Sequence, residues 1–158
     1  MIKPYAVFTR VLTVIAYPVS GFVLHNSRRV RVLIRFDDQV LLAKSSIGHQ
    51  KWSIPGGGIE KNENPMSAVV RETLEEVNIV ITEDMLVCTG EQRTGKNWPR
   101  VDMIFYIVDL PIQQEPHITR PLEILEAQWF ELTNLPDDYS ETLSTALNFA
   151  KTYKLNIR

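Results

Sequence analysis

The sequence is poor in the residues that build disulfides and zinc sites. Only one of its 158 residues, Cys88, is a cysteine, which excludes a disulfide within the chain and suits a reducing, cytoplasmic environment. Cys88 lies in an apolar run, so we expect a buried structural thiol rather than a nucleophile. The three histidines, His25, His49 and His117, are far apart and lack the spacing of zinc ligands, and we expect them on the surface or in loops.

Acidic residues are absent from the first part of the chain. No aspartate or glutamate precedes Asp37, whereas six lysines and arginines do. The first 36 residues are therefore basic, although the whole chain carries a formal net charge of -2. Cationic surfaces favour phosphate-rich polymers, so this part leaves RNA open as a partner.

A long uninterrupted apolar run is also missing. Residues 11–24 are nearly all apolar, but Pro18 and Gly21 interrupt them, and a membrane-spanning helix needs about 20 apolar residues. Arg10 and the lack of a small-residue cleavage pattern argue against a signal peptide. Three interpretations compete for this segment: packing on the domain, peripheral membrane contact, and export or spanning. We expect packing.

No repeat, low-complexity tract or linker divides the chain, so its length indicates one domain. We expect residues 29–158 to form this domain and residues 1–28 to be an apolar and basic segment packed on it. Apolar residues at helical spacing predict a closing helix over residues 140–153. Apolar runs bounded by turn residues predict strands at Val30–Phe36, Gln39–Lys44, Met85–Gln92, Val101–Leu110 and Ile124–Leu132.

Residues 57–79 have a spacing that indicates chemistry. On a helix, Glu72, Glu75 and Glu76 stand at positions i, i+3 and i+4, which places them on one face. Three converging carboxylates repel one another unless a cation lies among them. Hard divalent metals such as Mg²⁺ prefer all-oxygen ligation, so this face is a candidate metal site.

The surrounding residues predict the helix that carries these acids. Asn64 is a suitable N-cap, and Pro65 follows it in the first helical position. The glycine-rich loop Gly56-Gly57-Gly58 precedes the helix. Apolar residues at helical spacing predict a buried face opposite the acids, formed by Met66, Val69, Val70, Thr73, Leu74 and Val77.

The whole pattern resembles the signature sequence of the Nudix hydrolases. That signature reads Gly, five residues, Glu, seven residues, Arg-Glu, an aliphatic, any residue, Glu-Glu, any residue, Gly, an aliphatic. The chain departs from it at Thr73, where an aliphatic is usual, and at Asn78, which replaces the closing glycine. Asn78 is expected to keep the helix stop, because asparagine tolerates the left-handed conformation. The matching positions are Gly57, Glu63, Arg71, Glu72, Glu75 and Glu76.

The resemblance covers about residues 29–145 and implies an α+β fold, a Nudix-type α/β/α sandwich with a mixed sheet between helices. It also implies hydrolysis of a nucleoside diphosphate linked to another group. Mg²⁺, with Mn²⁺ as an alternative, would be held by Glu72, Glu75 and Glu76 together with a loop carbonyl such as that of Gly57.

The resemblance also assigns supporting roles. Arg71 would pair with Glu63 and hold Glu72 in place, unless the pair is a plain surface salt bridge. Glu123 precedes the strand containing Trp129-Phe130, where many relatives carry a catalytic acid, and we favour it as the general base. Two alternatives remain: Glu72 acting directly, and the neighbouring Glu126.

The substrate is the least determined part. Three cations and an aromatic residue in one loop, Arg93, Lys96, Trp98 and Arg100, are candidates for contacting phosphates and stacking on a base, although a solvated hairpin loop is equally consistent. Lys51, before the glycine loop, is a further candidate for a leaving phosphate.

We expect a small phosphorylated molecule as the substrate. A non-nucleotide diphosphate or the 5′ end of an RNA is the first alternative, and a non-catalytic nucleotide sensor is the second. A homodimer is an open possibility.

Overall fold

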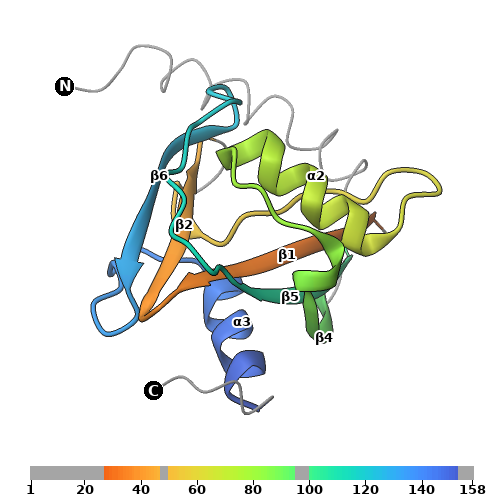
Figure 1. Ribbon diagram of the computed structural model, residues 1–158. Coiled ribbons are helices and arrows are strands. Elements are labelled where there is room, and N and C mark those ends of the chain that lie inside the picture. The colour runs from red at the N-terminus through yellow and green to blue at the C-terminus, as the bar shows by residue number, and fades with distance from the viewer. Residues whose placement is uncertain (1–26, 47–49, 95–99, 153–158) are drawn as a thin grey trace.

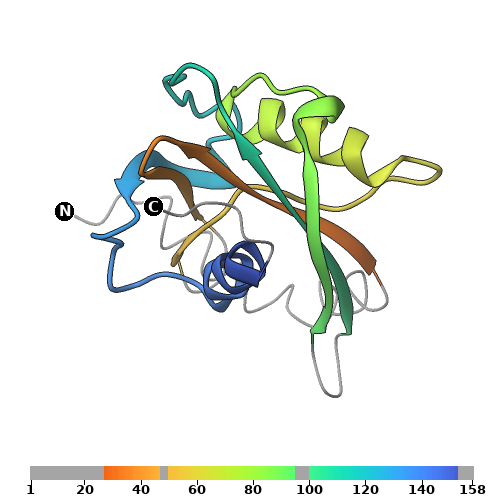
Figure 2. The same cartoon turned by 60° about the horizontal axis from the view of Figure 1, so that its bottom comes forward.

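The computed structural model describes residues 27–46, 50–94 and 100–152, and it consists of one mixed sheet covered by a helix on each face (Figures 1 and 2). Its strands are β1 (Ser27–Phe36), β2 (Gln39–Ser45), β3 (Trp52–Ser53), β4 (Val87–Thr94), β5 (Val101–Asp109) and β6 (Ile124–Glu131). Its helices are α2 (Pro65–Val77), α3 (Glu141–Thr152) and the short 3₁₀ helix η1 (Glu83–Met85).

The strands lie in the order β3-β2-β1-β5-β4, and β6 also pairs with β2. The sheet is mixed because it contains both parallel and antiparallel pairings. β1 and β5 run parallel along nine registered residue pairs, from Ser27 opposite Val101 to Arg35 opposite Asp109. The other pairings are antiparallel. The predicted α+β sandwich is therefore confirmed.

The two strands predicted at residues 30–36 and 39–44 form an antiparallel hairpin of β1 and β2, which is short. Asp37, in the left-handed region at φ 49°, makes the turn, and only two residue pairs follow before the strands separate. Beyond that point the glycine-rich loop lies along β1 instead, because the Val30 and Val32 amides donate to the Gly57 and Pro55 carbonyls at 2.9 and 3.0 Å. This arrangement brings the loop into the sheet.

Successive side chains of β1 and β5 point to opposite faces of the sheet, so the hydrophobic core is divided between these two faces. Val30, Val32 and Ile34 pack in the cluster that includes α2, whereas Leu33, Phe105 and Ile107 pack in the cluster that includes α3. Figures 1 and 2 show the two helices on opposite sides of the sheet. Residues 29 and 31 of β1 therefore belong to the α3 face by the same alternation.

Several expected boundaries shift. Met85 belongs to η1 rather than to a strand, and β4 continues to Thr94. β1 begins at Ser27, so the last two residues of the segment predicted as 1–28 belong to the sheet; residues 11–24 lie outside the described part. Cys88 is only half-buried, which corrects the buried thiol expected from its apolar neighbours.

Within the described ranges, none of the helices has the length and apolar character needed to cross a membrane.

Candidate active site

Helix α2 is capped at both ends by residues that the sequence identified. The Asn64 side chain accepts a hydrogen bond from the Met66 amide at 2.9 Å, and Pro65 begins the helix. Asn78 ends it in the left-handed conformation, at φ 55° and ψ 34°, and its amide donates to the Leu74 carbonyl. Asn78 thus does the work of the usual closing glycine.

The acids of α2 are not on the solvent side of the helix. Glu72 and Glu76 are only 6% and 8% exposed, while Leu74, expected on the buried face, is 46% exposed. The prediction that the apolar face lies opposite the acids is therefore wrong for these positions. The reason is the glycine-rich loop, which covers the Glu72 and Glu76 side of the helix and contacts it through polar groups.

Gly56 and Gly57 make this close approach possible. Gly56 has a φ of 134°, which side-chain-bearing residues rarely adopt, and a Cβ there would overlap the Val30 carbonyl oxygen. A Cβ on Gly57 would overlap the carboxylate of Glu72. The Gly56 amide in turn donates to Glu76 Oε2 at 3.0 Å. The loop therefore forms one wall of the acidic cluster.

Burial raises the pKa of the Glu76 carboxyl above its ordinary value. The Gly56 amide and Arg31 counteract this rise, whereas the nearby carboxylates of Glu72 and Glu123 add to it. A cation beside Glu76 would therefore stabilise its charged form.

Arg71 joins the acids of the helix to the loop. Its Nε and Nη2 donate to the two Glu63 oxygens at 2.8 and 3.0 Å, so the expected pair is present in bidentate form. Nη1 contacts Glu72 Oε1 at 2.9 Å and Glu75 Oε2 at 3.2 Å, and Nη2 also donates to the Gly58 carbonyl at 2.9 Å. The hydrogen bond from Arg71 lowers the pKa of Glu63 and, in return, raises the pKa of Arg71.

A second arginine, Arg120, reaches the same acids from the loop before β6. Its Nη2 pairs with Glu75 Oε2, and its Nη1 lies 3.9 Å from Glu72 Oε2 and 3.7 Å from Glu123 Oε2. Sequence reasoning missed this residue. Its position depends on the fold of the loop, because Arg120 is far from α2 in the sequence.

A cavity of about 610 Å³ opens beside the acids. Glu76 and Glu123 line it together with Arg29 and Arg31 of β1. Arg31 donates to the Gly56 carbonyl, and within the described residues its Nε has no hydrogen-bond partner although it is buried. Burial lowers the pKa of Arg31 to about 10, with repulsion from Arg29 adding to the effect, so Arg31 is still charged at neutral pH.

Arg29 and Arg31 were also missed from the sequence. The available signal was their spacing, since two arginines at i and i+2 of a strand share one face. The structure also distinguishes between the candidate bases Glu123 and Glu126. Glu123 lines the cavity, whereas Glu126 is exposed, lies opposite Lys44 on β2 and is not part of the cavity wall.

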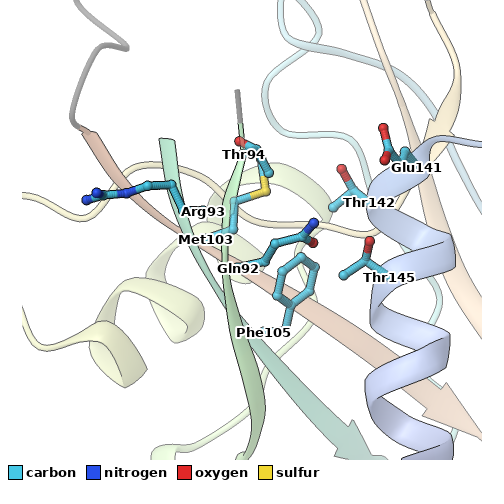
Figure 3. Close-up of a pocket in the computed structure, with 8 residues that line it drawn as sticks. All are labelled: Gln92, Arg93, Thr94, Met103, Phe105, Glu141, Thr142 and Thr145. Atoms are coloured by element: carbon cyan, nitrogen blue, oxygen red, sulfur yellow. The ribbon is translucent and has the colours of Figure 1, made fainter. Parts of the chain in front are cut away.

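Three of the five substrate-binding candidates, Arg93, Arg100 and Lys51, are among the described residues, and none of them lines the cavity beside the acids. Arg93 is bound by Asp102 at 2.5 and 2.9 Å, and Arg100 and Lys51 are exposed. Lys96 and Trp98 lie outside the described residues. A second cavity, of about 330 Å³, lies between strands β4 and β5 and the start of α3 (Figure 3).

This second cavity has an apolar floor and polar walls. Met103 and Phe105 of β5 form the floor, and Thr142 and Thr145 of α3 face it from the helix. Arg93 points away from α3 in Figure 3. Met103 lines both cavities, so the two are neighbours.

The oxygen atoms that this site offers are of the chemical type that a hard divalent cation prefers. Glu72, Glu75, Glu76 and Glu123 offer carboxylate oxygens only, and Arg71 and Arg120 show that positive charge is accommodated among them. Within the described part, no group of three or more acids, histidines or cysteines is already arranged to hold a metal ion. Arg71 and Arg120 instead contact the carboxylates of α2. The Gly57 carbonyl, expected as a ligand, accepts the Val30 amide.

Comparison with known proteins identifies the family. The model of the NUDIX domain matches residues 25–148. This chain belongs to the Nudix family. The matched range contains every described acid and arginine of the site, and it agrees with the extent of about residues 29–145 expected from the signature sequence.

Curated Nudix relatives resemble the chain over part of their length. The RNA pyrophosphohydrolase of Psychrobacter sp. (strain PRwf-1) is 34% identical over 102 residues, which is 64% of this chain and 51% of the relative. The human diphosphoinositol polyphosphate phosphohydrolase 3-beta is 46% identical over 43 residues, 27% of this chain and 26% of the relative. The chain thus spans about half, or less, of the length of the relatives it matches.

Solved structures of Nudix proteins share the fold. A MutT NUDIX hydrolase from Burkholderia pseudomallei superimposes with a TM-score of 0.71 at 23% identity, covering 78% of this chain and 97% of the other. The NUDIX domain of Shewanella oneidensis NrtR, solved with ADP ribose, gives a TM-score of 0.68 at 16% identity, covering 81% and 88%. At these identities the likeness concerns the fold alone.

Proposed function

We propose that this protein hydrolyses the pyrophosphate linkage of a nucleoside diphosphate derivative, releasing a nucleoside monophosphate and a phosphate-bearing product. One observation carries the proposal: carboxylates and arginines line the same cavity of about 610 Å³ beside the buried acids of α2. Such a cavity suits an anionic substrate whose phosphates need both a metal site and direct cationic contacts.

Glu72, Glu75 and Glu76 would hold Mg²⁺ or Mn²⁺, with the Gly57 region of the loop beside them. When bound, the cation neutralises phosphate oxygens and lowers the pKa of water. Arg71 orients Glu72 and Glu75 through its hydrogen bonds, and Glu63 anchors Arg71.

Glu123 is the proposed general base. It lines the cavity together with Glu76 and is half-exposed, so a water molecule at the cavity has access to its carboxylate. Its role would be to take the proton of the attacking water. Arg29 and Arg31, which line the same cavity, would bind phosphate oxygens.

The remaining part of the substrate has room in the second cavity, across Met103. Its apolar floor and threonine walls suit a base or sugar better than a further phosphate. Arg93, Arg100 and Lys51, with Lys96 and Trp98, remain proposed substrate contacts.

The alternative substrate is a 5′-phosphorylated RNA or a non-nucleotide diphosphate. The names of the Psychrobacter and human relatives favour this alternative. The exposed Arg28 of β1 adds positive charge next to Arg29. A non-catalytic nucleotide sensor is the second alternative, and the full set of acids at positions 63, 72, 75 and 76 speaks against it.

The experiment is a substrate panel. Nucleotides, nucleotide sugars, dinucleoside polyphosphates, 5′-triphosphorylated RNA and a diphosphoinositol polyphosphate are incubated with the protein and Mg²⁺, and the phosphate-containing products are identified. The proposal expects a nucleoside monophosphate from at least one member, and no product in EDTA. Cleavage of the RNA or the inositol compound alone would favour the alternative. Binding without cleavage would favour the sensor.

A further inference from the structure

Arg120 is a charged residue of the site that has no role in the proposed chemistry. Three candidate metal ligands or bases, Glu72, Glu75 and Glu123, surround its guanidinium. Within the described residues, these acids are the only side-chain partners that Arg120 has.

The backbone holds Arg120 in this place. The Arg120 carbonyl accepts the amides of Glu123 and Ile124 at 3.0 and 2.9 Å, so a tight turn places Arg120 and Glu123 on the same side. The preceding residue, Thr119, donates its hydroxyl to the Glu75 carbonyl, and the His117 amide donates to the Val77 carbonyl at 2.9 Å. The loop is therefore attached to the end of α2, and Arg120 is delivered to the acids by the fold.

The two arginines that form ion pairs with the acids of α2, Arg71 and Arg120, are held very differently. Arg71 has Glu63 and the Gly58 carbonyl as partners besides the acids of the cluster. Among the residues that the structure describes, Arg120 has only the cluster itself, and its side chain is 36% exposed. A divalent cation that took oxygens of Glu72 and Glu75 would therefore leave Arg71 with more of its described partners than Arg120.

We propose that Arg120 is an exchangeable cation of this site: it competes with the divalent metal for the carboxylates of Glu72 and Glu75, and after displacement it binds a phosphate oxygen of the substrate. A guanidinium and a metal ion cannot occupy the same carboxylate oxygens, and like charges repel at short range. The displaced guanidinium stays tethered by its turn next to Glu123 at the cavity, where it pairs with an anionic phosphate. This inference rests on the proposed function.

The proposal predicts two effects of opposite sign for Arg120→Gln. Binding of Mn²⁺ alone to the full chain, followed by electron paramagnetic resonance, should become about tenfold tighter because a competing charge is removed. Binding of methylenediphosphonate, an uncleavable diphosphate, in saturating Mn²⁺ should become about tenfold weaker because a phosphate contact is lost. Arg120→Lys should give smaller changes in the same directions.

Lys151→Gln is the matched control, since it removes one positive charge from an exposed position on α3 and should alter neither affinity. A merely structural role of Arg120 would weaken both kinds of binding together. That result, or an unchanged Mn²⁺ affinity, would overturn the proposal.

A further variant separates this proposal from the proposed function. If Glu76→Gln removes Mn²⁺ binding but Arg120→Gln does not tighten it, only the role of Arg120 fails. If the wild-type protein shows no Mn²⁺ binding that depends on Glu76, the metal site and the role of Arg120 fail together.

Discussion

At the residue scale, two candidate bases offer a direct comparison: Glu123, just before β6, and Glu126, within it. Glu123→Gln should lower kcat/KM by about 100-fold or more, because it removes the proton acceptor while keeping the size of the side chain. Glu126→Gln is the matched control: it is exposed and outside the cavity, so we expect less than a threefold change. Steady-state kinetics on the best substrate of the panel decide the point. A large loss in Glu126→Gln, with Glu123→Gln unaffected, would reverse the assignment.

A single methyl group tests the contact between the loop and the helix. Gly57→Ala would put a Cβ into the Glu72 carboxylate and displace it, so we expect Mn²⁺ affinity to fall by about tenfold or more. Gly58→Ala has open space at its Cβ and should bind Mn²⁺ like the wild type. Titration of both variants provides the measurement, and equal affinities would show that the glycine loop does not shape the metal site.

What the sequence predicted at this scale follows from local spacing. Glu72, Glu75 and Glu76 share a helix face by geometry, and the Arg71–Glu63 pair came from the resemblance. The burial of Glu72 and Glu76 was not predictable, because charged residues are normally expected at the surface. The glycine-rich loop that covers them comes into contact with the helix only in the folded structure. Arg31 and Arg120 were missed for a related reason: they join the site through the β1–loop pairing and the turn before β6.

At the element scale, α2 is the part that the sequence specifies best. Its N-cap, first-turn proline and left-handed stop are all local signals, and each is confirmed. The pairing of β2 is different: β1 and β2 share only two residue pairs, whereas β6 pairs with β2 along its whole length, from Gln39 to Ser45. No local pattern reports this, because β6 lies about 90 residues later in the chain.

The helix stop yields a stability prediction. Asn78→Ala should lower the free energy of unfolding by about 1 kcal/mol, because alanine pays a steric cost in the left-handed conformation that asparagine tolerates better. Asn78→Gly should be at least as stable as the wild type, since glycine adopts this conformation without strain. Urea unfolding of the three proteins checks the order. A stable Asn78→Ala variant would mean that the stop does not require the left-handed conformation.

At the scale of the whole molecule, the buried acid links stability to pH. Burial raises the pKa of Glu76, so the folded state holds this proton more tightly than the unfolded state does. Ionising Glu76 therefore costs stability as the pH rises through the ordinary glutamate pKa to the raised value. In EDTA, Glu76→Gln should be more stable than the wild type at neutral pH and should approach it at about pH 4, where the glutamate is protonated. The glutamine can still accept the Gly56 amide.

Glu63→Gln should change the stability at neutral pH in the opposite direction in the same experiment. The hydrogen bond from Arg71 lowers the pKa of Glu63, so its contribution is present above the ordinary glutamate pKa and is lost as the pH falls through the lowered value. This variant should be less stable than the wild type at neutral pH. Thermal unfolding between pH 4 and 7 measures both variants, and a Glu76→Gln variant less stable than the wild type at pH 7 would contradict the account.

The central claim is that the acids of α2 hold a divalent cation that makes diphosphate hydrolysis possible. The most direct measurement is the kcat/KM of Glu76→Gln against wild type in Mg²⁺, on whichever substrate the panel identifies. We predict a loss of at least about 100-fold, with wild-type activity abolished by EDTA and restored by added Mg²⁺. Hydrolysis that survives Glu76→Gln, or that persists in EDTA, would contradict the metal site on which the proposed function rests.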